Sequence, residues 1–173
     1  MKSIKSAAQA GFTLIELIVV IVILGILAAT ALPKFVSFGG DARAASVTAV
    51  KGSLGSSASM IKGRWIVDAG KNGNVVTVEG TAVNVVAGNG YPVADDKFYT
   101  AAGLQTSDYA IIGGTATAVP ATTTSPAAAA NQLVFVPKGI ENSASSVNCY
   151  AAYTQPAAST TNAPDIKAVI SSC

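Results

Sequence analysis

The chain has 173 residues, of which 50% are hydrophobic and only 12% are charged, and its formal net charge is +2 at pH 7. It contains no histidine, which removes the commonest metal ligand and the commonest general base. Without Lys2 and Lys5, its 11 basic residues fall to nine, equal to the nine acidic ones. We therefore expect no basic surface for nucleic acid, no metal site and no cofactor.

A short basic segment, residues 1–11, precedes a long apolar one. From Phe12 to Pro33 the only ionisable side chain is Glu16. As a helix, this segment would span about 33 Å, enough to cross a bilayer core of about 30 Å. The two lysines in front of it predict a single membrane pass with a cytoplasmic N-terminus.

Three interpretations of this segment are open. A cleaved secretory signal peptide has a similar basic start, and residues 28–31 (Ala-Ala-Thr-Ala) could imitate its cleavage site, but its apolar core is normally about 7–15 residues long. An ordinary membrane anchor accounts for the length and leaves Glu16 unexplained, because a carboxylate inside an apolar segment is costly and usually functional. The third interpretation comes from a resemblance.

The string Gly11-Phe12-Thr13-Leu14-Ile15-Glu16, behind a short basic leader, resembles the type IV prepilin signal. In type IV pilins a membrane prepilin peptidase cuts after the glycine, and the new N-terminal phenylalanine is N-methylated. The resemblance therefore implies removal of residues 1–11 as a leader, N-methylation of Phe12 and retention of the apolar helix. It covers residues 1–65 and extends more loosely over the rest of the chain.

The resemblance also implies how copies of the chain assemble. Cleavage would free a positive amine on Phe12, four residues before Glu16. A carboxylate near a helix N-terminus is already favoured by the helix dipole, so a purely local role for Glu16 stays open. The resemblance implies instead that Glu16 pairs with the Phe12 amine of a neighbouring subunit, and that Thr13, Gly25 and Pro33 also serve assembly.

An amphipathic pattern follows the apolar segment. Apolar residues recur there at steps of three and four, as in a helix that is buried along one face. They are Val47, Val50, Leu54, Ala58, Ile61 and Trp65. We therefore predict one long helix over residues 12–65, with a protruding hydrophobic half (12–33) and an amphipathic half (34–65) packed on a head.

Gly25, Pro33 and the pair Gly39-Gly40 are weak points of the predicted helix, because glycine and proline are poor helix residues. In filaments of the family that the chain resembles, helicity can be lost between the positions of Gly25 and Pro33. A static kink is the alternative.

Residues 66–173 predict a β-rich head. A turn cluster at residues 70–74 precedes two short runs joined at Gly80, which predict a hairpin. The expected strands are residues 75–79, 81–87, 109–112, 133–136, 149–154 and 166–170. The Ala/Thr/Pro-rich segment 116–130 is expected to be a long exposed loop. Strands packed on one helix give an α+β, pilin-like fold with an antiparallel sheet.

The chain has two cysteines, Cys149 and Cys173. They allow one intramolecular disulfide, which would bound a region of residues 149–173 and would persist outside the cytoplasm. Two thiols without histidine are too few for a closed zinc site, and their spacing differs from a C-x-x-C redox pair. A disulfide-bounded C-terminal region also recurs in type IV pilins, and this pair resembles it in place and spacing.

Other candidate sites are weak. The adjacent carboxylates Asp95 and Asp96 are expected in a solvated surface turn, with calcium binding or a subunit contact as alternatives. The pair Gly113-Gly114 lacks the context of a phosphate-binding loop. We therefore expect no catalytic residue and no enzymatic activity.

The resemblance implies the major structural subunit of a type IVa pilus; a minor pilin or a type II secretion pseudopilin is the alternative. The helix over 41–65 and the turn Gly90-Tyr91-Pro92 are similar to those of the mannose-sensitive haemagglutinin subgroup. The implied partners are further copies of the chain in a helical filament, prepilin peptidase, the inner-membrane assembly machinery and the membrane. The implied location is the inner membrane before assembly and an extracellular adhesive filament afterwards.

Overall fold

The computed structural model describes residues 12–68 and 73–173. The predicted leader, which includes Gly11, and residues 70–72 of the predicted turn cluster lie outside the described residues. The chain divides into two compact units, Met1–Gly39 and Gly40–Cys173.

Helix α1 (Leu14–Val67) begins in the first unit and ends in the second. The predicted long helix is confirmed, although it begins and ends two residues later than expected. The helix continues through Gly25 and Pro33. The loss of helicity between these two residues therefore stays a prediction about the assembled state.

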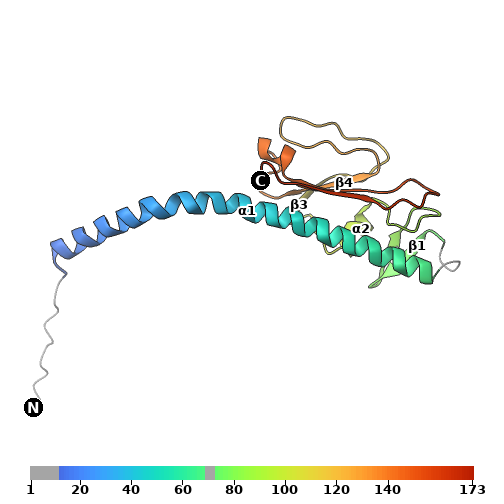
Figure 1. The fold of residues 1–173 in the computed structure, drawn as a ribbon, viewed down its shortest axis with the longest axis horizontal. Helices are drawn as coiled ribbons and strands as arrows, with labels where there is room; N and C mark the ends of the chain where they lie inside the picture. Colours follow the sequence, from blue (N-terminus) through green and yellow to red (C-terminus); the bar gives the residue numbers. More distant parts are fainter. Residues whose placement is uncertain (1–11, 69–72) are drawn as a thin grey trace, which may run out of the picture. The chain divides into compact units, whose positions relative to one another are not determined.

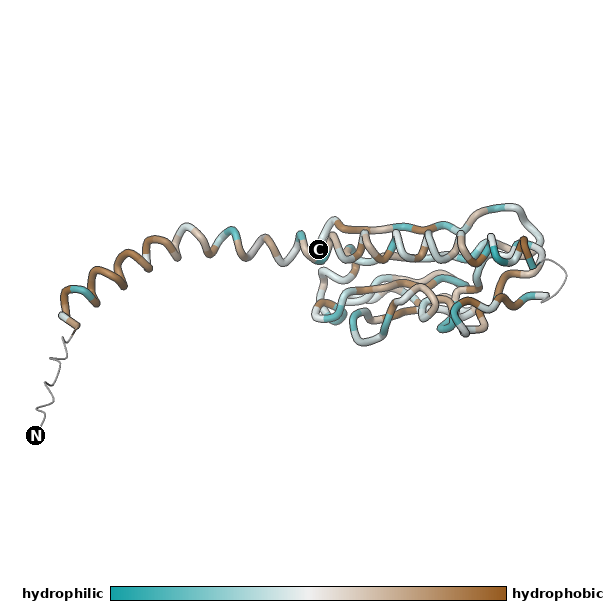
Figure 2. The backbone as a smooth tube through the Cα atoms, turned by 90° about the horizontal axis from the view of Figure 1, so that it is seen from below, coloured by the Kyte–Doolittle hydropathy of each residue, from teal (hydrophilic) through white to brown (hydrophobic). Residues whose placement is uncertain are grey.

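The first unit exposes apolar side chains on every side of the helix. All large apolar residues from Phe12 to Leu32 are between 43% and 93% exposed. Figure 2 shows this stretch as a nearly continuous apolar run interrupted near its start by a hydrophilic residue. A helix that is apolar all round needs either lipid or other protein to cover it.

In the second unit, α1 lies along one face of a four-stranded antiparallel sheet (Figure 1). The strands are, in spatial order, β3 (Tyr109–Gly113), β4 (Gln132–Pro137), β5 (Tyr150–Thr154) and β6 (Asp165–Val169). A separate two-stranded sheet pairs β1 (Val75–Val78) with β2 (Thr81–Asn84). All six predicted strands are present, with bounds within three residues of those expected.

The turn between β1 and β2 matches the predicted hairpin. Val78 pairs with Thr81, so Glu79 and Gly80 form a two-residue loop. Both have positive φ, 47° and 82°, as a type I′ hairpin turn requires.

The main core lies between α1 and the inner face of the four-stranded sheet. The predicted stripe supplies the helix side, where Val47, Val50, Leu54, Ala58 and Ile61 are each at most 2% exposed. The half-buried Trp65 packs against the same cluster. Burying each large aliphatic side chain stabilises the fold by about 1.5–3 kcal/mol, so this stripe fixes the register of the helix on the sheet.

Two short helices were not predicted: α2 (Asp96–Ala101) and the 3-10 helix η1 (Ala144–Asn148). The expectation of a solvated turn at Asp95-Asp96 was wrong for Asp95, which is the N-cap of α2. Its Oδ1 accepts a hydrogen bond from Phe98 N at 3.0 Å, and its Oδ2 accepts from Asn84 Nδ2 at 2.7 Å. Aspartate is a preferred N-cap residue, and α2 is too short to show a helical period in the sequence.

The segment 116–130 is more ordered than the predicted loop. Most of its side chains are exposed, but its ends and its tip are bridged, Val119 with Ala128 and Thr122 with Ser125. Ala128 is 1% exposed and joins a second small core on the outer face of the sheet. The small alanine side chains permit the segment to approach the sheet closely. Because the alanines follow no clear period, the sequence did not predict this packing.

Candidate functional site

Thr13 and Glu16 form the N-terminal cap of α1. Glu16 Oε2 accepts hydrogen bonds from Thr13 N at 3.0 Å and from Thr13 Oγ1 at 2.8 Å. Thr13 Oγ1 accepts in turn from Glu16 N at 3.3 Å. This reciprocal arrangement is a capping box, which satisfies two backbone donors that the first turn leaves unpaired. The sequence interpretation missed it, although the spacing Thr-x-x-Glu is its signal.

The cap occupies only one oxygen of the Glu16 carboxylate. Among the described residues, Glu16 Oε1 accepts no hydrogen bond. The carboxylate therefore retains an acceptor and its charge on the surface of the otherwise apolar stretch from Phe12 to Leu32. That is the chemistry needed to bind an ammonium group from outside the subunit.

The structure brings together some predicted assembly residues and not others. Thr13 and Glu16 are in contact, and Phe12 precedes them with 93% of its surface exposed. Gly25 and Pro33 lie further along α1 and are also exposed. A Cβ added at Gly25 would meet nothing within 4 Å. A helical glycine costs about 1 kcal/mol relative to alanine, and no close packing within the described subunit accounts for it.

The apolar start of α1 has the length and composition of a membrane span. From Phe12 to Pro33 its only ionisable side chain is Glu16, and none of its large apolar side chains is buried within the described chain. About 20 apolar residues are needed to cross a bilayer as a helix. The segment is therefore a candidate membrane anchor by these two criteria.

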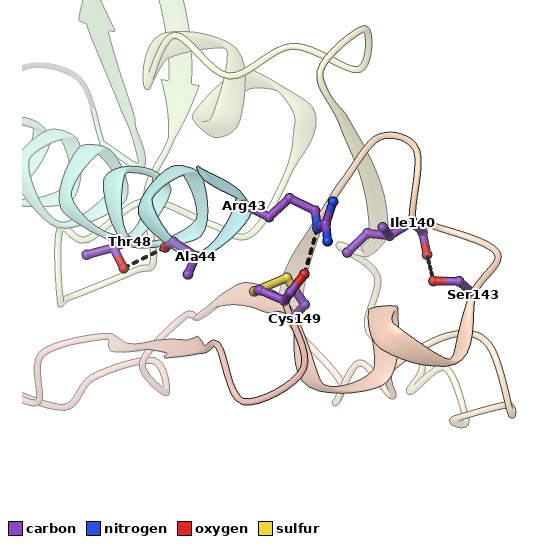
Figure 3. The surroundings of a disulfide bond; sticks show 7 residues. Arg43, Ala44, Thr48, Ile140, Ser143 and Cys149 are labelled. Carbon is purple, nitrogen blue, oxygen red and sulfur yellow. Dashed lines mark hydrogen bonds between the residues drawn. A yellow bond between two sulfur atoms is a disulfide. The ribbon is translucent and has the colours of Figure 1, made fainter. Parts of the chain in front are cut away.

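The second candidate feature is a disulfide between Cys149 and Cys173, with an S–S distance of 2.04 Å. Cys149 is fully buried in the main core. Arg43 Nε, from α1, donates a hydrogen bond to the backbone oxygen of Cys173 at 2.7 Å (Figure 3). A Cβ added at Gly40 would lie 3.4 Å from the Cys173 carbonyl carbon. The disulfide therefore lies against α1, and no sequence signal identified Gly40 or Arg43 as its neighbours.

A cavity of about 580 Å³ lies beside α2 and β3, lined in part by Asp95, Asp96, Tyr99 and Lys138. Both carboxylate oxygens of Asp95 are already hydrogen-bonded within the fold, and Lys138 forms an ion pair with Glu141 at 3.7 Å. Hydrogen bonding to its own backbone and to that of Gly139, together with the charge of Lys138, lowers the pKa of Glu141. In the part of the chain that the structure describes, no group of three or more metal-ligating side chains comes together.

Comparisons with known proteins address the N-terminal segment alone. Searches of curated proteins and of solved structures gave no significant match. Residues 6–32 match the family model described as the prokaryotic N-terminal methylation motif. This range contains the Gly11–Phe12 bond, the capping box and the exposed apolar run from Phe12 to Leu32. The chain therefore carries, at residues 6–32, a type IV pilin-like prepilin signal.

Proposed function

We propose that the chain is the major structural subunit of a type IV pilus. Prepilin peptidase cuts it between Gly11 and Phe12, Phe12 is N-methylated, and the inner-membrane machinery polymerises the product into an extracellular filament used for attachment. One observation carries this proposal: the methylation motif at residues 6–32 coincides with a helical segment that is apolar on all sides and bears one carboxylate, Glu16.

The exposed apolar run supports two successive environments. Before assembly, lipid covers Phe12–Leu32, because a bilayer is the one solvent that accepts such a helix in isolation. After the leader is removed, the same side chains can be covered by the helices of further copies. Because either lipid or neighbouring helices can cover the same apolar surface, the subunit can pass from the membrane into a filament without refolding its head.

Glu16 supports a defined register between subunits. A carboxylate placed among packed apolar helices must be neutralised by a partner. The amine that cleavage creates on Phe12 of a neighbouring copy is positively charged. Glu16 Oε1 can accept its hydrogen bond, because the capping box uses only Oε2. The pairing is complete only in the assembled state, so it would favour assembly at one register.

The head supports an extracytoplasmic location. The disulfide between Cys149 and Cys173 persists in an oxidising compartment. We further propose membership of the mannose-sensitive haemagglutinin subgroup of type IVa pilins. This rests on the helix 41–65 and on the turn Gly90-Tyr91-Pro92, which packs against Trp65.

A minor pilin and a type II secretion pseudopilin remain the competing assignments, because both share the N-terminal signal. The disulfide favours a pilin over a major pseudopilin, which typically lacks one. Abundance separates a major from a minor subunit, since only a major subunit accounts for most of the filament mass.

Mass spectrometry of protein sheared from the cell surface tests the proposal. We expect the sheared fraction to consist mainly of this chain, beginning at an N-methylated Phe12 and carrying the Cys149–Cys173 disulfide. A chain that keeps residues 1–11, or that is absent from surface filaments, contradicts the proposal. A trace amount in filaments dominated by another pilin supports the minor-pilin assignment.

A further inference from the structure

A tight turn at residues 87–90 lies against the loop that connects β5 to β6, residues 155–164. Asn89, inside this turn, is 1% exposed. Its Nδ2 donates to Thr160 O at 2.7 Å, to Asn162 O at 3.1 Å and to Thr160 Oγ1 at 3.3 Å. One buried amide thus holds two backbone carbonyls of the loop.

The backbone adds to this contact. Ser159 N donates to Ala87 O at 3.0 Å. Gly88 has φ +70°, and a Cβ added there would lie 3.4 Å from Ser159 Cα. The turn and the loop therefore touch along several residues, and Asn89 supplies the side-chain hydrogen bonds between them.

The same turn is fastened to α1. Lys62 Nζ donates a hydrogen bond to Asn89 O and lies 4.7 Å from the centre of the Trp65 ring and 5.3 Å from that of Tyr91. Gly90 has φ +78°, and a Cβ there would lie 2.3 Å from Trp65 ring atoms. Contacts therefore run without a gap from α1 through the turn to the loop.

A second attachment to α1 lies at the C-terminal end of the region 149–173. There, Arg43 Nε donates a hydrogen bond to the backbone oxygen of Cys173. The side chain of Cys173 is joined to Cys149 by the disulfide. Arg43 and Lys62 are separated by about 28 Å along α1, at about 1.5 Å per residue. In addition to the core packing of β5 and β6 on α1, polar contacts thus attach the region 149–173 to this helix at two distant places. Only one of these two places involves a disulfide-bonded residue.

We propose that Asn89 is a latch that fixes the loop 155–164 to α1 independently of the Cys149–Cys173 disulfide. Residues 161–163 of this loop are exposed, and its small, polar composition is typical of mobile surface loops. The latch keeps this exposed segment in one conformation. The head then presents a rigid surface even where the redox state of the cysteines changes.

Asn89→Asp tests the latch with a side chain of the same shape. The substitution replaces the donor Nδ2 with an acceptor, so the attractive contacts with the Thr160 and Asn162 carbonyls become repulsive. The matched control is Asn162→Ala, which alters an exposed loop side chain but keeps the carbonyl that Asn89 binds. The third variant, Cys149→Ser with Cys173→Ser, removes the disulfide and leaves Asn89 in place.

The readout is the mobility of a nitroxide attached at Thr161→Cys in the full chain in detergent, measured by electron paramagnetic resonance. A second label at Thr123→Cys, exposed on the 116–130 segment, reports on the rest of the head. In the Asn89→Asp protein we expect the correlation time at position 161 to fall severalfold, into the nanosecond range of free loops, with no change at position 123. Asn162→Ala and the paired serine variant should leave position 161 ordered.

Three results overturn the latch. Position 161 could stay ordered in Asn89→Asp, which would mean that the amide does not fix the loop. Position 123 could become mobile as well, which would make Asn89 a residue of the general fold. The paired serine variant could free position 161 as fully as Asn89→Asp, which would make the disulfide the fixing element.

Discussion

The carboxylate of Glu16 is hydrogen-bonded to Thr13 twice, through the backbone N–H at 3.0 Å and the hydroxyl at 2.8 Å, at the first turn of α1. Glu16 therefore caps the helix within a single subunit, independently of any contact with a second subunit. A capping box accepts glutamine in place of glutamate, because the amide oxygen can receive the same hydrogen bond. Substitutions at these two positions can accordingly separate the cap from the charge.

Glu16→Gln keeps the cap and removes the charge. If the charge pairs with the Phe12 amine of another copy, the substituted protein should insert in the membrane, fold its head and lose its leader, but form few filaments. The reason is that the amine would be left unpaired among packed apolar helices. Filaments sheared from cells and counted by electron microscopy provide the measurement. A normal filament yield would reduce Glu16 to a helix cap.

Thr13→Val provides the complementary change. It removes the hydroxyl while keeping the shape and leaves the Glu16 charge in place. Loss of an N-cap typically costs about 1 kcal/mol, and one fraying turn at the start of α1 should lower filament yield less than Glu16→Gln does. Thr13→Ser retains the hydroxyl and should behave like the native chain. Equal losses for Thr13→Val and Glu16→Gln would show that the cap, and not the charge, limits assembly.

The disulfide should stabilise the head more than its hydrogen bond to Arg43 does. Closing a loop with a sequence separation of 24 is worth about 3.5 kcal/mol in the chain-entropy model. Cys149→Ser with Cys173→Ser should lower the free energy of unfolding by about that amount. Arg43→Met should cost about 1 kcal/mol, the usual net value of one hydrogen bond. Urea titration of the full chain in detergent, followed by Trp65 fluorescence, measures both. A larger loss for Arg43→Met than for the cysteine pair would contradict this ranking.

The sequence predicted the long helix and all six strands because both have strong periodic signals. The stripe from Val47 to Ile61 repeats at helical spacing, and the β-branched runs are bounded by glycine turns. The same reasoning failed at α2, whose six residues are too few for a period. The sequence analysis also placed Glu16 near the helix N-terminus, but it did not predict the hydrogen bonds between Glu16 and Thr13.

Contacts between residues distant in the sequence were beyond prediction from a single chain. Arg43 and Cys173 are 130 residues apart, and Asn89 and Thr160 are 71 apart. Each contact depends on how segments far apart in the chain pack together in the second unit, which no local pattern encodes. Glycines give a partial signal: Gly88 and Gly90 mark a turn in the sequence, but only the structure shows that Trp65 packs on one of them.

Gly90→Ala should displace the single tryptophan of the chain. The added Cβ would lie 2.3 Å from the Trp65 ring, so the ring must move toward solvent. We expect the Trp65 emission to shift to longer wavelength and acrylamide quenching to increase. Gly139→Ala is the matched control, because Gly139 also has positive φ, 91°, but has nothing within 4 Å of an added Cβ. Both variants should lose about 1–2 kcal/mol from backbone strain, but only Gly90→Ala should alter the fluorescence. An unchanged spectrum in Gly90→Ala would contradict the packing of Trp65 on this turn.

Tyr153 should make the head sensitive to high pH. Its side chain is fully buried, and its hydroxyl donates to Pro92 O at 2.7 Å. Burial raises the pKa of Tyr153 well above its usual value, and the nearby Tyr91 and Asp95 add to this effect. The folded state therefore keeps the phenolic proton, whereas the unfolded chain loses it near pH 10. The stabilisation is complete below about pH 10 and is lost as pH rises further, by about 1.4 kcal/mol per pH unit for this one proton.

Tyr153→Phe isolates this contribution from that of the other groups that titrate at high pH. At pH 8 the native chain should be more stable than Tyr153→Phe by about 1 kcal/mol, the net value of the lost hydrogen bond. Above pH 10 the gap should shrink and then reverse, because phenylalanine has no proton for the unfolded chain to release. Urea titrations of both proteins between pH 8 and pH 12 give the two curves. Parallel curves over this range would mean that Tyr153 ionises in the folded head as easily as in the unfolded chain, and would contradict the burial of its hydroxyl between β5 and Pro92.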